Sequence, residues 1–293
     1  MSEIVFPEGL NPNYKYVTGG DYVPKNIKIT HVGNLYKNST NYVIDVQADT
    51  SNVTDMSSMF YDSNIQYVAL FNTSNVTNMS YMFQVCGDLI TVAQFDTSNV
   101  TNMSNMFNGC SKLISVPLFD TSSVTNMEKM FYQCTNLTSV PLFDTSSVTT
   151  MSNMFNRAEN LTTIPQFDTS NVTDMTQMFY YSKIISIPLL DCGKINYGSK
   201  IDIVGSYNTP TLTTLGGFKD LGKVSSFNKP SYFLKVCPNL TKESVLNVLN
   251  NLYDRNTAGY SVVTLPFHTN SLALLTDEEK AIATNKGWTL ATS

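Results

Sequence analysis

The sequence predicts an α/β repeat solenoid: leucine-rich-repeat-like coils of about 24 residues, stacked through short parallel strands and short helical turns, with a cap at each end. Three observations predict this fold. Segments of 24 residues that begin at Gln94, Leu118 and Leu142 align with one another without a gap. Equivalent positions in the segments hold the same residue type, and the pattern stops near both ends of the chain.

The repeat divides the chain into three parts. Residues 1–50 lack it and are rich in Tyr, Asn, Gly and Pro, so we expect an N-terminal cap or attachment segment there. Residues 51–195 carry the repeats, and residues 196–293 pass from degenerate repeats into a C-terminal α/β cap. Caps are expected because a stack of coils leaves an apolar face open at each end.

Each coil contributes two methionines and two phenylalanines at fixed positions. Stacking places equivalent residues of neighbouring coils about 4.8 Å apart, so these positions form columns. Apolar residues repeated in register are typical of an interior, so we predict core ladders rather than a methionine-rich binding surface. The columns are Met56, Met79, Met103, Met127, Met151 and Met175; Met59, Met82, Met106, Met130, Met154 and Met178; Phe60, Phe83, Phe107, Phe131, Phe155 and Phe179; and Phe71, Phe95, Phe119, Phe143 and Phe167.

Within a coil, Leu113, Val116 and Leu118 fit the start of a leucine-rich repeat, where one short strand per coil lines a parallel sheet. We expect strands at residues 113–116 and 124–127, with a helical turn over residues 103–110. Pro117 belongs to a proline column, and proline cannot donate to a strand ladder, so the first strand must end there.

An acidic column and a cysteine column run through the repeats. Asp96 and its equivalents precede Thr-Ser, which favours turns capped by the aspartate over the alternative of a calcium site. Cys86, Cys110 and Cys134 share a position that continues as Ala158, so we interpret the cysteines as small packing residues rather than disulfide partners. Only two histidines are present, and neither has a companion at ligand spacing, so we predict no metal site.

The last part of the chain shows helix signals. Thr241 is placed to cap a helix that carries Val245 and Leu249 on one face, and an alternating strand follows at residues 261–267. Thr276 and Glu279 form a capping box for a second helix that stops before Gly287. We expect Trp288, the only tryptophan, to seal the last coil.

Composition excludes several partners. The formal net charge is −5 and only 14% of residues are charged, so a nucleic acid is not an expected partner. No apolar run reaches the roughly 18 residues of a membrane span, and the first residues lack the features of a secretion signal. We therefore expect a protein that is cytoplasmic, that leaves the cell by lysis, or that is assembled into a particle before release.

The sequence carries no motif for catalysis or for a cofactor. A glycine-rich phosphate loop, a G-x-S-x-G elbow and an H-E-x-x-H pair are all missing, so we predict a non-enzymatic protein without catalytic residues or cofactor. Paired carboxylates are recognised only in three dimensions, which keeps a glycan hydrolase as a third hypothesis.

Binding residues are expected where the coils differ. The positions just after the Met-Phe pair, and their neighbours, vary and often hold tyrosine, which offers a large rigid contact surface with one polar tip. The candidates are Tyr61, Tyr81, Tyr132, Tyr180 and Tyr181.

The block FDTSNVTNMSNMFNGCSKL resembles the BspA-like family of bacterial leucine-rich-repeat surface proteins, over residues 51 to about 195. The endings NLTKESVLNVLNNLYDR and LTDEEKAIATNKGWTLA are similar to the segment that accompanies such repeats in gut bacteria and their phages. The resemblance implies adhesion or host contact. Combined with the missing signal, it leads us to expect a bacteriophage virion component, such as a tail or head fibre or a decoration protein.

The expected partner is a bacterial surface protein or glycan, or another virion protein. The alternative is an adhesin on the bacterial cell surface. Fibres carried on particles commonly form symmetric oligomers, so a homo-oligomer is a further hypothesis.

Overall fold

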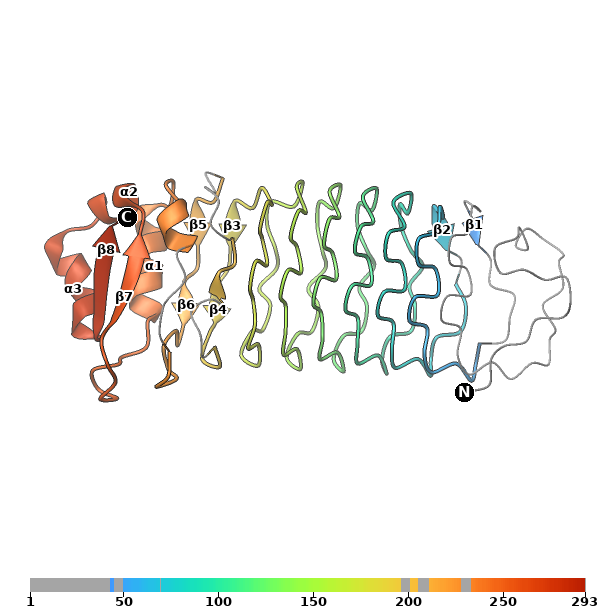
Figure 1. Cartoon of the computed structure of the whole chain (residues 1–293), viewed down its shortest axis with the longest axis horizontal. Helices are drawn as coiled ribbons and strands as arrows, with labels where there is room; N and C mark the ends of the chain where they lie inside the picture. Colours follow the sequence, from blue (N-terminus) through green and yellow to red (C-terminus); the bar gives the residue numbers. More distant parts are fainter. Residues whose placement is uncertain are drawn as a thin grey trace, which may run out of the picture.

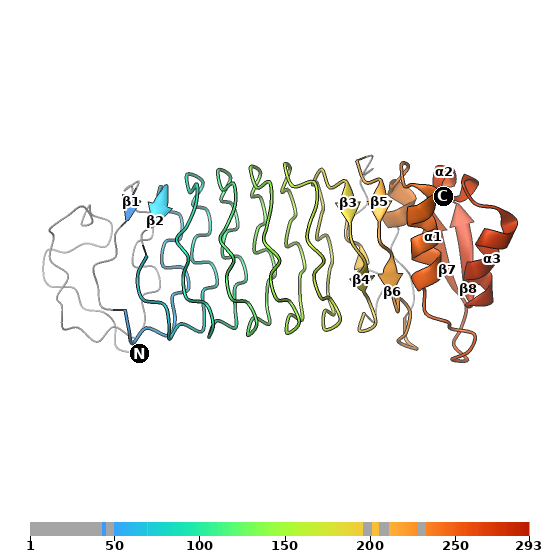
Figure 2. The same cartoon turned by 180° about the vertical axis from the view of Figure 1, so that it is seen from behind.

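The computed structural model describes residues 43–44, 50–68, 70–195, 201–204, 211–227 and 233–292. These residues form an elongated row of stacked coils, with the helices gathered at the C-terminal end (Figures 1 and 2). The expected N-terminal cap or attachment segment, residues 1–50, lies outside the described residues apart from 43–44 and Thr50.

The methionine and phenylalanine columns form the core, as predicted. Every methionine in the two columns is fully buried, and the phenylalanines are buried too. The ring of Phe107 stacks on those of Phe83 and Phe131 at centroid distances of 5.5 and 5.6 Å, nearly parallel to both. Such apolar ladders stabilise the stack because each coil removes its neighbour's apolar surface from water.

The strand expected at residues 113–116 does not form. Leu113 N bonds back to Cys110 O in its own coil, Ile114 N makes one long bond of 3.4 Å to Ile90 O, and Pro117 has no N–H to give. The equivalent stretch is a two-residue strand only near the ends of the repeats, in β2 (Tyr67–Val68) and β3 (Ser186–Ile187).

Over residues 124–127 the pairing is confined to one residue per coil. Asn126 pairs in parallel with Asn102 on one side and with Thr150 on the other, and the same pairing runs from Asp55 to Asp174. These single pairings, the short strands and the near absence of helix before residue 233 describe a tandem-repeat stack over the described residues.

The helical turn expected at residues 103–110 is wrong. Met106 N bonds within the coil to Met103 O, but Asn105 N and Phe107 N cross to the next coil, at Glu128 O (2.8 Å) and Met130 O (2.9 Å). A helix would use every N–H inside its own segment. Here alternate N–H groups join the coils instead, and left-handed residues such as Asn105 (φ 57°) turn the chain between them.

Short parallel pairs connect the repeats to the C-terminal part. Strand β3 pairs with β5 (Thr214–Leu215), and β4 (Leu190–Asp191) pairs with β6 (Phe218–Lys219). The pair β1 (Val43–Ile44) and β2 is also parallel. A short 3₁₀ helix, η2 (Phe233–Val236), follows β6.

The C-terminal helices begin where the sequence predicts. Helix α1 (Lys242–Asn251) starts at Thr241, whose side chain accepts a bond from Ser244 N, and packs on β5 and β6. Helix α3 (Asp277–Asn285) carries the predicted capping box of Thr276 and Glu279. Strands β7 (Val263–Phe267) and β8 (Trp288–Thr292) pair in parallel, with α3 packed against β8.

Two details complete this end of the molecule. Helix α2 (Thr269–Ala273), which was not predicted, is capped by Nδ1 of His268, which accepts a bond from Asn270 N. Trp288 is buried, and its indole N–H donates to Tyr253 O at 2.9 Å. A Cβ at Gly222, which has a φ of +83°, would lie 2.5 Å from that indole ring. None of the described helices is long and apolar enough to cross a bilayer.

Candidate binding groove

The variable positions of the repeats share one face of the stack. In the coil from Met79 to Cys86, both methionines, Phe83 and Cys86 point inward and are buried, whereas Tyr81 is 39% exposed. The left-handed backbone at Tyr81 and Val85 makes this division possible, because it reverses the chain direction between inward residues. Each coil therefore turns the residues equivalent to Tyr81 and Gln84 toward this face.

Main-chain groups on this face are already bonded. Tyr81 N donates to Ser104 O and Phe83 N to Met106 O in the next coil, while Gln84 N donates to Tyr81 O in its own coil. The same alternation repeats along the stack. Recognition at this face must therefore come from side chains rather than from strand addition.

These side chains line an open groove of about 810 Å³ that crosses five successive coils. Its lining is dominated by tyrosine and by the amides of asparagine and glutamine. The lining residues are Tyr81, Gln84, Ser104, Asn105, Asn108, Asn126, Glu128, Lys129, Tyr132, Asn153, Asn156, Arg157, Gln177 and Tyr180.

Long and short side chains alternate along the groove. The first, third and fifth coils place pairs of long side chains on it, which are Tyr81 with Gln84, Lys129 with Tyr132, and Gln177 with Tyr180. The second and fourth coils place asparagine pairs there, which are Asn105 with Asn108, and Asn153 with Asn156, and the fourth coil adds Arg157. We call these two asparagine pairs the asparagine notches.

The notches have the same internal geometry. Asn108 Nδ2 donates to Asn105 Oδ1 at 2.9 Å, and Asn156 Nδ2 donates to Asn153 Oδ1 at 2.8 Å. Asn156 is only 3% exposed, and its Oδ1 accepts no hydrogen bond from any described residue. A buried amide oxygen left in this condition costs about 1–3 kcal/mol.

The groove carries little net charge. Its ionic side chains are Glu128, Lys129 and Arg157, so one carboxylate faces two cations. Lys129 Nζ lies 3.1 Å from Glu128 Oε1, and both side chains are more than a third exposed, so the pair contributes little stability. The Arg157 guanidinium lies 4.7 Å from the centre of the Tyr181 ring.

Three of the five tyrosines named from the sequence line the groove, which are Tyr81, Tyr132 and Tyr180. Tyr181 lies at its edge, against Tyr180 at 4.3 Å and beside Arg157. Tyr61 is not part of the lining. Asn108 and Asn156 stand at the variable position just after the Met-Phe pair, but only tyrosines were chosen there as binding candidates, so the asparagine pairs were missed.

The aspartate column caps turns. Asp96 Oδ1 accepts bonds from Ser98 N and Ser98 Oγ, at 3.1 and 2.7 Å, and the Ser98 hydroxyl is the main reason that the pKa of Asp96 is lowered. The pKa values of Asp144 and Asp168 are lowered by the same kind of serine bond. Within the described ranges, no group of three or more His, Cys, Asp or Glu side chains is placed to hold a metal ion.

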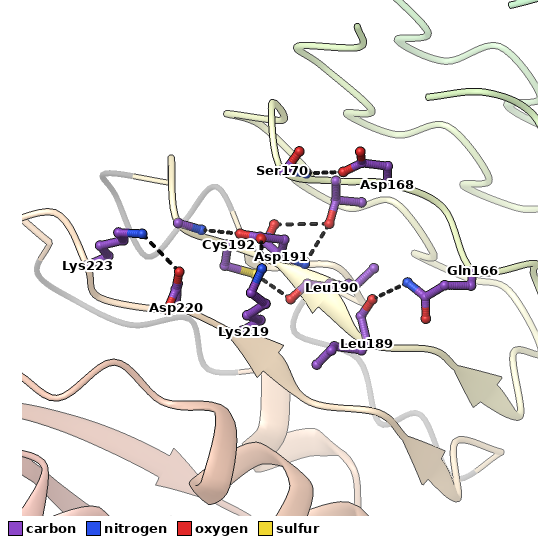
Figure 3. A network of polar contacts seen from close by, with 12 residues as sticks. Gln166, Asp168, Ser170, Leu189, Leu190, Asp191, Cys192, Lys219, Asp220 and Lys223 are labelled. Atoms are coloured by element: carbon purple, nitrogen blue, oxygen red, sulfur yellow. Dashed lines mark hydrogen bonds and ion pairs between the residues drawn. The ribbon is translucent and has the colours of Figure 1, made fainter. Parts of the chain in front are cut away.

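A smaller hollow of about 280 Å³ lies where the repeats meet β6. Asp191 Oδ2 lies 2.8 Å from Lys219 Nζ, and Gln166 Nε2 donates to Leu189 O at 2.7 Å (Figure 3). Asp220 and Lys223 form a further pair alongside. Since these polar groups bond to one another across successive coils, we interpret the hollow as a structural junction rather than a ligand site.

Comparison with known proteins identifies the repeats. A family model described as "Mycoplasma protein of unknown function, DUF285" matches residues 24–116 and again residues 111–193, which together make up more than half of the chain. Two tandem matches agree with a repeat protein of the BspA-like kind. No curated protein matches the sequence.

Proposed function

Because the chain belongs to the DUF285 family, whose function is unknown, we propose a function from the groove itself: a non-enzymatic binding protein that grips its target along the stacked coils. The observation that carries the proposal is the groove of about 810 Å³ to which five successive coils contribute outward side chains over a rigid, fully bonded backbone. Binding sites on such rigid scaffolds lose little conformational entropy when the target is bound.

Two further features support binding rather than catalysis. Tyrosine, asparagine and arginine are typical of recognition surfaces, and all three line the groove. Of its lining residues only Glu128 is acidic, and it is paired with Lys129, whereas glycoside cleavage uses two carboxylates.

The coils belong to the leucine-rich-repeat class in this proposal, with a backbone more irregular than the usual one. The protein acts as a bacteriophage virion component that contacts a bacterial surface molecule or another virion protein. The second setting is the surface of a bacterial cell, where the same groove would serve an adhesin. The proposal for the groove is the same in both settings.

The binding function is tested with purified protein and intact bacterial cells from the source material. Replacing Tyr81, Tyr132 and Tyr180 together by alanine should reduce cell binding by about tenfold or more, since buried aromatic contacts dominate such interfaces. Tyr61→Ala, which removes a tyrosine outside the groove lining, is the matched control and should bind as the parent does. Equal binding by the triple variant would refute a role for the groove.

The setting is tested separately by mass spectrometry of purified phage particles and by protease shaving of intact cells. Peptides of the protein at structural-protein abundance in particles support the virion setting. Release of the same peptides by shaving, with none in particles, supports the adhesin.

A further inference from the structure

We infer that the ligand of the groove is a linear, uncharged glycan that lies along the stack, with every second sugar unit seated at an asparagine notch. The inference rests on the proposed binding function and names the class of ligand. It does not depend on whether the protein is displayed on a virion or on a cell.

The chemistry of the lining favours hydroxyl groups as partners. A side-chain amide offers a donor and an acceptor side by side, which matches neighbouring hydroxyls on a sugar ring. Each notch holds two asparagines, and Gln84 and Gln177 stand on the coils beside them. The apolar sockets that a peptide's side chains would need are lacking in this lining, which is made of polar and tyrosine side chains.

The tyrosines supply flat apolar surface next to these amides. Tyr81, Tyr132 and Tyr180 stand on the first, third and fifth coils, so a tyrosine flanks each notch on both sides. An aromatic face can pack against the C–H face of a sugar while its hydroxyl stays bonded. The groove therefore alternates packing surfaces with hydrogen-bonding surfaces along its length.

The spacing of the notches matches a chain with a two-unit repeat. The notches lie two coils apart, or about 10 Å at the usual spacing of neighbouring strands. In an extended glycan whose alternate units face the same side, equivalent hydroxyls recur once per disaccharide, over a comparable length. Two successive disaccharides would then make the same contacts at Asn105–Asn108 and at Asn153–Asn156.

The charge of the lining agrees with an uncharged ligand. Lys129 is paired with Glu128, which leaves Arg157 as the single uncompensated charge in the lining, so the groove has no strong preference for an anion. A neutral glycan requires no further ionic partner.

The test is a variant that fills one notch without disturbing the fold. Asn108→Tyr places at residue 108 the residue that the same column already carries at Tyr132 and Tyr180, so the backbone accepts it. Ser139→Tyr is the matched control: it adds a tyrosine to an exposed column outside the groove that already carries Tyr67. Both variants are compared with the parent for binding to intact bacterial cells and to β-1,4-linked glucose and N-acetylglucosamine oligosaccharides of two, four and six units.

The inference expects equal cell binding by the parent and by Ser139→Tyr, and binding by Asn108→Tyr that is weaker by about tenfold or more. Periodate treatment of the cells, which cleaves vicinal diols of sugars, should abolish binding, and protease treatment should leave it intact. A gain in affinity from two to four units that Asn108→Tyr removes would support the two-notch arrangement directly.

Three results would overturn the inference. If protease treatment of the cells removes binding through the groove and periodate treatment does not, the ligand is a protein. The glycan is then rejected, but the proposed binding function is not. Unchanged binding by Asn108→Tyr rejects the notches. Failure of the parent to bind cells at all rejects the proposed function, and the glycan with it.

Discussion

At the scale of single residues, buried threonines link neighbouring coils through side-chain hydrogen bonds. Thr121 is fully buried, and its hydroxyl donates to Asp144 O in the next coil at 2.8 Å, the one donor that the described residues supply to that carbonyl. Its equivalents make the same contact all along the stack. They are Thr50, Thr73, Thr97, Thr145 and Thr169. The buried hydroxyl of Thr121 has this carbonyl as its acceptor, so replacing it by a methyl group removes the bond without a substitute.

Thr121→Val should therefore lower the free energy of unfolding by about 1–3 kcal/mol, because it keeps the shape and removes the donor to Asp144 O. Urea denaturation followed by circular dichroism measures the change. Thr125→Val is the control, since Thr125 is exposed and Thr101 O also accepts the Thr125 backbone N–H. Its effect should stay below about 0.5 kcal/mol, and equal losses in the two variants would contradict the argument.

The cysteine column packs in the core of the stack. Cys86, Cys110 and Cys134 are buried and free, and each thiol lies within hydrogen-bonding distance of a phenylalanine carbonyl of the preceding coil. Burial raises the pKa of the Cys86 thiol to about 12 from an ordinary value of about 9, and it raises the pKa of the other two as well. Ala158 occupies the same column, so the stack accepts a side chain that cannot ionise.

These shifts make alkaline pH destabilising. Above about pH 9 the unfolded chain releases thiol protons that the folded chain keeps until about pH 12, so the free energy of unfolding falls as pH rises between these values. Thermal unfolding between pH 8 and 11 should show this fall in the parent. The variant with alanine at 86, 110 and 134 should start at a lower melting temperature but decline less steeply, and parallel curves would show that the thiols are not responsible.

At the scale of elements, the turns that form the groove face depend on left-handed residues. Two positions per coil adopt positive φ, and most of them are not glycine. Val85 is the most unfavourable case, because it is β-branched, has a φ of 63° and remains 45% exposed. Its conformation is imposed by the bonds of Phe83 and Val85 to the next coil.

Val85→Asn should raise the free energy of unfolding by about 1 kcal/mol, because asparagine tolerates the left-handed region at lower cost. Chemical denaturation measures the gain. Val262→Asn changes a similarly exposed valine that lacks a positive φ and should be neutral or slightly destabilising. A gain at both positions would point to a general surface effect rather than relief of strain.

The extent to which the fold could be predicted also differs between elements. The core columns and the capped helices α1 and α3 were predictable, since burial and capping depend on local spacing and on residue type. The path of residues 103–110 was not, because apolar spacing determines which residues face inward but not whether an N–H bonds within its coil or to the next. The asparagine notches were not predicted for a related reason, since long and short side chains come together in one groove only when successive coils are stacked.

For the whole molecule, the repeat makes length an adjustable property. Within the described repeats, each coil bonds to the coils on either side, so stability is expected to be a sum of nearest-neighbour terms. Residues 118–141 form one complete unit, and the residues that would become neighbours, Pro117 and Leu142, reproduce the natural Pro141–Leu142 junction.

Deleting residues 118–141 should consequently leave a folded protein with the parent's circular dichroism spectrum, a maximum dimension about 5 Å shorter by small-angle scattering, and a modestly lower melting temperature. Deleting residues 118–129 instead joins half coils, takes the methionine and phenylalanine columns out of register and should abolish cooperative unfolding.

The 24-residue deletion also removes Lys129 and Tyr132, which separate the two notches, and brings Asn105–Asn108 next to Asn153–Asn156. If the shortened protein stays folded but no longer binds longer oligosaccharides more tightly than short ones, recognition depends on the spacing of the coils. If it does not fold, stability does not depend on contacts between neighbouring coils alone.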